Sequence, residues 1–275
     1  MRLTALLLVL LAACATPKPS GESLAKSRLG EAEVRAAALA RSGDYAGAAR
    51  HYGEALRLAT ALDNADAIAA NAINLSVVQQ WLGRDAEARA ALGAVLDDPR
   101  TPFSERRKLQ AELRRAILDL SAGNVGAAAV WAGQADRRCA GACEYAATIV
   151  NVRAQVALES GKPAEAAQLA QSALERSRGP AGRTEAANAL RTLGRARLAQ
   201  GNPSSALEAL KQALELDREL GDPRKILADL NDLSRAAEAA GDARAATDYK
   251  ERGLAVSRAM NDGKSGPEME ALLRR

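Results

Sequence analysis

The chain has 275 residues, which is enough for one or two domains with a sizeable buried core. Aromatic residues make up only 3% of it, whereas alanine, the best helix former, makes up about a quarter. Because strands favour β-branched and aromatic residues, the composition predicts an all-α protein. The net charge is +4, and no basic run of the kind typical of nucleic-acid-binding proteins occurs.

The first 13 residues predict a signal peptide. Arg2 precedes an apolar run that is too short to span a bilayer as a helix, as in the apolar region of a secretory signal. The run ends in the sequence LAAC at residues 11–14, which resembles the lipobox of bacterial lipoproteins. The resemblance implies cleavage before Cys14 and attachment of lipid, including palmitate, to its thiol. The alternative is an ordinary secretory peptide with a chance cysteine.

The residues after the lipobox predict a tether. Residues 14–24 contain a stretch rich in Pro, Gly and Ser, which does not start a helix easily. Ala15 follows the cysteine where lipoproteins retained in the inner membrane of enterobacteria have Asp. This similarity implies a protein anchored to the outer membrane and facing the periplasm.

A repeat of about 40 residues organises the rest of the chain. Six glycines recur at intervals of 38 or 40 residues, and an alanine follows each of them five positions later. Such a glycine ends a helix in the left-handed conformation, and the alanine lies where two helices cross closely. The glycines are Gly43, Gly83, Gly123, Gly161, Gly201 and Gly241, and the alanines are Ala48, Ala88, Ala128, Ala166, Ala206 and Ala246.

A second break recurs between these units, for example at Gly179-Pro180 and at Gly221-Asp222-Pro223. The two kinds of break together predict six helical hairpins, and hence twelve helices, between residues 25 and 264. A last amphipathic segment, residues 265–275, is expected to form a short helix that caps the final hairpin.

The repeat resembles the tetratricopeptide repeat. Residues 43–56 carry Gly-Asp-Tyr and the spaced Ala, Tyr and Ala-Leu of the second half of that consensus, and residues 190–214 match both halves. The period of 40 is similar to a longer-helix subtype of the family. The resemblance implies a right-handed α-solenoid with a concave inner surface, lined by the first helix of each hairpin, that binds a partner.

Transferred position by position, the family's groove positions select two sets of residues. The set from the second and third units is largely apolar and the set from the later units is polar and basic, which suits a peptide backbone or its carboxylates. The alternatives are packing against the facing helix or the tether for the first set and a solvated helix face for the second. The first set is Ile73, Val77, Gln80, Trp81, Leu113, Ile117 and Leu120, and the second is Asn151, Gln155, Asn188, Arg191, Arg195, Asn231 and Arg235.

Cys139 and Cys143 fall at a break between units, with Gly141 between them. A secreted protein folds in an oxidising compartment, so a disulfide that holds this turn is favoured over two free thiols. A metal site is not expected, because no third and fourth ligand lie nearby in the sequence.

No pattern in the sequence predicts an enzyme or a cofactor. His51 is the only histidine, and it is expected to be a packed or surface residue rather than a catalytic one. No phosphate-binding loop, nucleophile elbow or dinucleotide fingerprint is present.

The sequence therefore favours a non-catalytic, lipid-anchored periplasmic scaffold that binds a segment of another cell-envelope protein in its groove. Envelope assembly, piloting of a secretin or pilus component, and recruitment of cell-wall enzymes remain open as roles. Two alternatives are a self-associating structural protein and a cell-wall-directed enzyme or carbohydrate-binding protein. For sugar stacking, Trp81 is the one suitable aromatic residue in the groove.

Overall fold

A computed structural model describes residues 23–99, 101–141 and 143–261. In these residues the chain forms twelve α-helices, one short 3-10 helix and no strand, so the predicted all-α class is confirmed. The elements are α1 Leu24–Arg41, α2 Tyr45–Ala61, α3 Ala65–Trp81, α4 Asp85–Leu96, α5 Glu105–Ser121, α6 Val125–Cys139, α7 Ala146–Glu159, α8 Pro163–Arg176, η1 Pro180–Gly182, α9 Arg183–Ala199, α10 Pro203–Leu220, α11 Pro223–Ala239 and α12 Ala243–Asn261.

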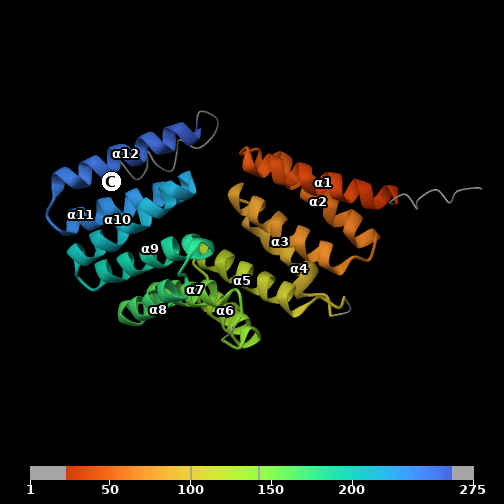
Figure 1. Cartoon of the computed structure of the whole chain (residues 1–275), viewed down its shortest axis with the longest axis horizontal. Coiled ribbons are helices and arrows are strands. Elements are labelled where there is room, and N and C mark those ends of the chain that lie inside the picture. Colours follow the sequence, from red (N-terminus) through yellow and green to blue (C-terminus); the bar gives the residue numbers. More distant parts are fainter. Residues whose placement is uncertain (1–22, 100, 142, 262–275) are drawn as a thin grey trace, which may run out of the picture.

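The helices pair in sequence as α1 with α2, α3 with α4, and so on to α11 with α12, which makes six hairpins in the described part of the chain. First helices of successive hairpins also pack on one another, namely α3 on α5, α5 on α7, α7 on α9 and α9 on α11. The hairpins form an arch, with α1 and α2 on one side of an opening and α11 and α12 on the other (Figure 1). The predicted solenoid of six hairpins is thus confirmed.

The turn inside each hairpin depends on its glycine. All six repeat glycines have φ between +71° and +85°, the left-handed region that disfavours residues with a Cβ atom. In the first and sixth hairpins the residue after the glycine also caps the next helix. Asp44 accepts a hydrogen bond from the backbone N–H of Gly47 at 2.8 Å, and Asp242 accepts one from the backbone N–H of Ala245 at 2.9 Å. The glycine turn thus ends one helix, and the antiparallel neighbour starts within a few residues.

The crossing of the two helices depends on the alanine. Five of the six repeat alanines are completely buried, and Ala246 is 3% exposed. In the fifth hairpin the two helices approach closely, since a Cβ on Gly194 of α9 would lie 2.5 Å from Cγ of Leu210 of α10. The register assigned from the sequence therefore matches the packing of the helices.

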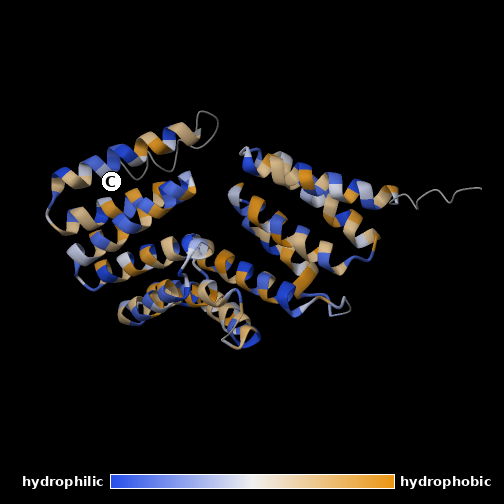
Figure 2. Ribbon diagram, in the orientation of Figure 1, coloured by the Kyte–Doolittle hydropathy of each residue, from blue (hydrophilic) through white to orange (hydrophobic). Residues whose placement is uncertain are grey.

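Each helix carries both hydrophobic and hydrophilic residues along its length (Figure 2). The hydrophobic residues gather in clusters that join neighbouring hairpins; one such cluster includes Leu29 of α1, Ile68 of α3 and Leu118 of α5. A hairpin therefore buries its apolar faces against its neighbours and not by itself, which is the physical reason for stacking.

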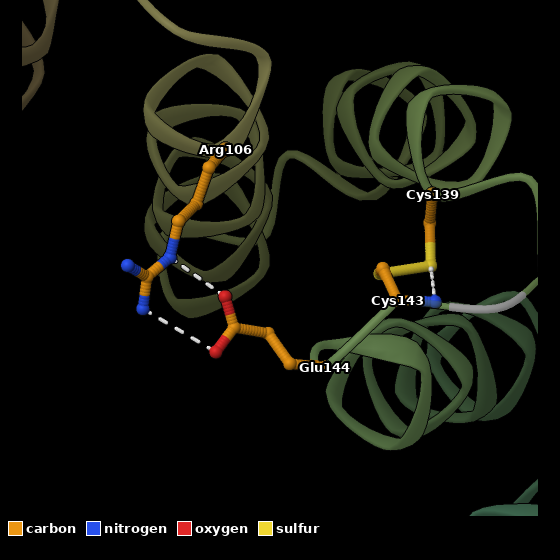
Figure 3. Close-up of a disulfide and its surroundings, with 4 residues drawn as sticks. All are labelled: Arg106, Cys139, Cys143 and Glu144. Carbon is orange, nitrogen blue, oxygen red and sulfur yellow. Dashed lines mark hydrogen bonds and ion pairs between the residues drawn. A yellow bond between two sulfur atoms is a disulfide. The ribbon is translucent and has the colours of Figure 1, made fainter.

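A disulfide joins Cys139, the last residue of α6, to Cys143, ahead of α7, and their Cα atoms are 5.2 Å apart (Figure 3). The turn between them uses left-handed backbone at Ala140 and Gly141. Next to it, Glu144 accepts from Nε of Arg106 of α5 at 2.6 Å. The bridge and the ion pair hold the junction between the third and fourth hairpins.

Helix α1 begins at Leu24 with Ser23 as its N-cap, so the last residue assigned to the tether is already helical. The predicted signal peptide at 1–13, the lipidated Cys14 and the capping helix at 265–275 lie outside the described residues. Among the helices that the structure describes, none has the length and apolar character needed to cross a bilayer.

Ala206→Leu is expected to destabilise the protein by about 1–3 kcal/mol, because a larger side chain at a fully buried crossing forces the helices apart. The matched control, Ala127→Leu, places the same side chain at an exposed position of α6 and should change stability by less than about 0.5 kcal/mol. Chemical denaturation followed by circular dichroism measures both. Equal midpoints for the two variants would show that the crossing register is wrong.

Candidate functional site

A pocket of about 360 Å³ opens on the side of the arch that the first helices line. Its walls come from α3, α5 and α7 and from the first turn of α9, so four successive hairpins contribute. The lining residues are Ala70, Ile73, Asn74, Arg107, Gln110, Leu113, Arg114, Ile117, Tyr145, Thr148 and Glu185.

The apolar part of this pocket consists of residues selected from the sequence. Ile73 of α3 meets Leu113 and Ile117 of α5 at the pocket, as their groove positions predict. Leu113 is buried, and the other two are half-buried and belong to the surface that a ligand would meet. An apolar surface of this kind gains free energy when a partner's apolar side chain covers it.

Arg114 is the distinctive polar residue of the pocket. Its Nε donates to Oγ of Ser76 at 2.9 Å, and its Nη2 donates to the Ser76 carbonyl oxygen at 3.0 Å and to Oε1 of Gln80 at 2.7 Å. Gln80 in turn donates to Oγ of Ser121. These neutral acceptors therefore fix the orientation of the guanidinium. Because they carry no charge, they do not act as its counter-ion.

Burial lowers the pKa of Arg114 to about 10, and Asp85 opposes that shift weakly. The side chain is still protonated at neutral pH. No carboxylate of the described residues lies within ion-pair distance of it, whereas Arg107, in the same pocket, binds both carboxylate oxygens of Asp66 at 2.7 and 2.8 Å. The pocket thus presents a partly buried, oriented cation beside an apolar surface.

Sequence reasoning missed Arg114, Gln110, Tyr145 and Glu185. Arg107, Gln110, Arg114 and Ile117 follow one another at intervals of three, four and three, which places them on one face of α5. That spacing was a usable signal for α5. Tyr145 and Glu185 lie at the starts of α7 and α9, and only stacking of the hairpins brings them to the pocket.

The expectation for Arg191 is wrong. Its Nε donates to Oδ1 of Asp229 at 2.6 Å, its Nη2 binds Asp217, and its Nη1 donates to Oδ1 of Asn188 at 3.2 Å. The arginine is 9% exposed and both aspartates are fully buried. Arg191 is an internal counter-ion that joins α9, α10 and α11, so replacing it with Glu would test folding rather than partner binding.

Other members of the polar set also have partners within the chain. Asp232 binds both Arg195 and Arg235, although Arg235 is otherwise exposed. Asn231 is half-buried, and its Oδ1 would lie 3.7 Å from a Cβ on Gly253 of α12.

Asn151 is buried, and Thr192 and Glu185 hydrogen-bond to it. Gln155 and Asn188 are half-buried, and Leu120 packs into the cluster around Leu109 and Ile149.

Trp81 does not line the pocket. Its ring meets Tyr45 edge to face with 4.9 Å between centroids, and the guanidinium of Arg224 lies over it at 4.3 Å. Val77, half-buried one turn earlier on α3, is likewise not among the lining residues.

His51 lies on α2 with Nδ1 3.5 Å from Glu54. The described residues contain no cluster of three or more His, Cys, Asp or Glu side chains that could hold a metal ion.

Comparison with known families gives a match to the tetratricopeptide repeat family at residues 144–219 and 185–259. The two matched segments cover the fourth, fifth and sixth hairpins. Together they span residues 144–259, fewer than half of the chain, and over this part the chain resembles the tetratricopeptide repeat. Such repeats imply a scaffold for protein–protein interaction, and the fold is generally non-catalytic.

A search of curated proteins gives no match. Solved structures with a similar fold include BtubC from P. vanneervenii, with 20% identity, a TM-score of 0.55 and coverage of 90% of this chain and 96% of that one. The hetero-tetramer Cut9-Hcn1 of the APC/C has 16% identity and a TM-score of 0.65 over 91% of this chain and 42% of that one. A Rap protein complexed with Competence and Sporulation Factor has 14% identity and a TM-score of 0.64, with coverages of 86% and 77%. At these identities the likeness concerns the fold alone.

Asp229, which binds Arg191 in the interior, makes stability depend on pH. Burial raises the pKa of Asp229 to about 6, against the opposing hydrogen bond from Arg191. A carboxyl with a raised pKa in the folded state stabilises the fold when protonated, and this contribution is lost as the pH rises from about 4 through 6.

Asn at position 229 cannot ionise, so the Asp229→Asn variant does not lose this contribution as the pH rises. The free energy of unfolding of the variant minus that of the natural chain is therefore expected to increase across that window, by an amount on the order of 1–3 kcal/mol above pH 6. Urea denaturation between pH 4 and pH 7.5 measures the difference. The exposed Asp248→Asn serves as control and should give a curve parallel to that of the natural chain. A parallel curve for Asp229→Asn as well would contradict the raised pKa.

Proposed function

We propose that this protein is a non-catalytic scaffold that binds a segment of another cell-envelope protein in the pocket between α3, α5, α7 and α9. The observation that carries the proposal is Arg114, a partly buried guanidinium, oriented by neutral groups and placed at the edge of an apolar surface. A buried charge without a counter-ion is costly, and a ligand that supplies a carboxylate offsets that cost on binding.

The pocket defines the chemistry of the segment. A carboxylate would face Arg114, and an apolar side chain next to it would cover Ile73, Leu113 and Ile117. At the other end of the pocket, Glu185 can accept hydrogen bonds from the backbone N–H groups or the basic side chains of the segment. A volume near 360 Å³ lies in the range of sites that hold a small group of atoms and suits one or two side chains.

The anchoring half of the proposal rests on the N-terminal sequence. The LAAC motif at residues 11–14 supports lipid attachment at Cys14, and Ala15 supports sorting to the outer membrane. With a short tether between Cys14 and α1, the arch would stand next to the membrane and face the periplasm. Assembly of envelope proteins, piloting of a secretin or pilus component, and recruitment of cell-wall enzymes are the roles that suit such a position.

The two alternatives gain less support from the site. A carbohydrate-binding protein needs an aromatic face for sugar stacking, and Arg224 lies over the ring of Trp81. A self-associating structural protein would use the same pocket for a segment of a second copy. Measuring the mass in solution separates that case from a scaffold that binds a different protein.

Arg114→Gln is expected to weaken partner binding about tenfold or more, because a hydrogen-bonded pair with a charged group contributes roughly 1.5–3 kcal/mol. The measurement places a photo-crosslinking amino acid at Ile117 and identifies the proteins crosslinked in intact envelopes. A partner recovered from the natural Arg114 background should be lost in the variant, and raised salt should reduce its recovery.

The matched control is Arg197→Gln, which removes the same charge from an exposed position of α9. Circular dichroism verifies that both variants keep their helical content. Equal recovery of the same partner with Arg114→Gln and Arg197→Gln would rule out Arg114 as the residue that binds the carboxylate.

Cys14→Ser is expected to leave the protein without lipid, either soluble in the periplasm or held as its precursor. Intact-mass measurement of the natural mature chain should show an N-terminal cysteine bearing acyl chains. An unmodified mature chain would contradict the anchor and leave the pocket proposal unaffected.

A further inference from the structure

Arg224 connects the two ends of the solenoid. It is the second residue of α11, and Asp222, the N-cap of that helix, accepts a hydrogen bond from its backbone N–H at 3.1 Å. Its guanidinium carbon lies 4.3 Å from the ring centroid of Trp81 and 4.4 Å from that of Tyr45. The sixth hairpin thereby touches the first and second across the opening of the arch, where the junction of α10 and α11 faces the end of α3 (Figure 1).

Tyr45 and Trp81 form a two-walled aromatic corner. Tyr45 is the first residue of α2 and Trp81 the last of α3, and their ring planes meet at 62°. Two rings at such an angle present their negative faces to one cation at the same time, and a flat guanidinium suits both. Trp81 stays 43% exposed with Arg224 in place, so the corner is open to solvent and to other molecules.

Rings and not carboxylates hold the guanidinium of Arg224. No ion pair joins this side chain to an acidic residue within the described chain, in contrast to Arg191 with its two aspartates. Helix α11 packs on α9, α10 and α12 in its own half of the molecule. A contact of this kind at a partly exposed site is weak, and another guanidinium can replace Arg224 without loss of the contact made with the rings.

We propose that Tyr45 and Trp81 form a binding site for a guanidinium group, which Arg224 fills when the ends of the solenoid meet and which an arginine side chain of the bound segment fills when they part. The proposal rests on the proposed function for the source of that arginine. The segment would then carry an arginine in addition to the carboxylate that faces Arg114. Binding at the corner favours the open arch, since it occupies the rings that the closed arch uses.

The first experiment follows Trp81 by fluorescence. The chain has two tryptophans, so Trp131→Phe in the full chain leaves Trp81 as the sole emitter. Because Trp81 is already 43% exposed, removal of its cover by Arg224→Gln is expected to raise quenching by acrylamide by up to about twofold. Arg252→Gln, which removes a different arginine over a different ring, Tyr249, should leave quenching unchanged.

The probe for the empty corner is N-acetyl-arginine amide, compared with N-acetyl-citrulline amide, which has nearly the same shape and no charge. In the Arg224→Gln chain the arginine probe should restore protection of Trp81 in a saturable manner, and the citrulline probe should not. Equal effects of the two probes, or quenching unchanged by Arg224→Gln, would overturn the guanidinium site.

The second experiment measures opening by small-angle X-ray scattering. The radius of gyration should increase in Arg224→Gln, should increase in the natural chain at saturating arginine probe, and should stay constant in Arg252→Gln. A constant radius in all of them would overturn the link between the corner and the opening.

The fluorescence and scattering measurements use no partner protein. A negative result in them would therefore argue against the guanidinium site without testing the pocket of the proposed function. A response to the arginine probe together with partner recovery independent of Arg114 would reject the pocket and keep the guanidinium site. Partner recovery that depends on Arg114 but not on the Tyr45 and Trp81 rings would reject the arginine in the segment.

Discussion

The close crossing of two helices at a buried alanine is the constraint on which the rest of the structure depends. With no larger side chain between them, the two backbones of a hairpin approach so closely that Gly194 of α9 has no room for a Cβ atom against Leu210 of α10. A pair packed in this way still has apolar faces left over, and only neighbouring hairpins can cover them. Stacking then aligns the first helices side by side, and their shared face becomes the pocket.

This constraint is local and repeated, which explains how far the sequence could predict the fold. A left-handed turn favours glycine and a close crossing favours alanine, so two residues that lie five positions apart predict the geometry of each hairpin. The same reasoning placed Ile73, Leu113 and Ile117 together, since equivalent positions of stacked repeats face the same side. No long-range information was needed for either conclusion.

Charge pairing depends on partners from other hairpins, and there the sequence was a poor guide. Arg191 occupies a groove position by register, but Asp217 and Asp229, 26 and 38 residues further along, bind it in the interior. The repeat register predicts which way a helix face points. It does not predict whether the next hairpin places a carboxylate against that face. The contact of Trp81 with Arg224 is more distant still, because it depends on the curvature accumulated over the hairpins between them.

Three arginines show how the environment of one side chain determines its role. Arg191 meets two carboxylates and is satisfied within the fold, so it contributes to cohesion between hairpins. Arg114 meets a hydroxyl, a carbonyl and an amide, which fix its direction without neutralising its charge. Arg224 meets two aromatic faces, which hold a cation without neutralising it. In a protein whose basic residues slightly outnumber its acidic ones, Arg114 and Arg224 carry charges that no carboxylate of the described residues pairs with.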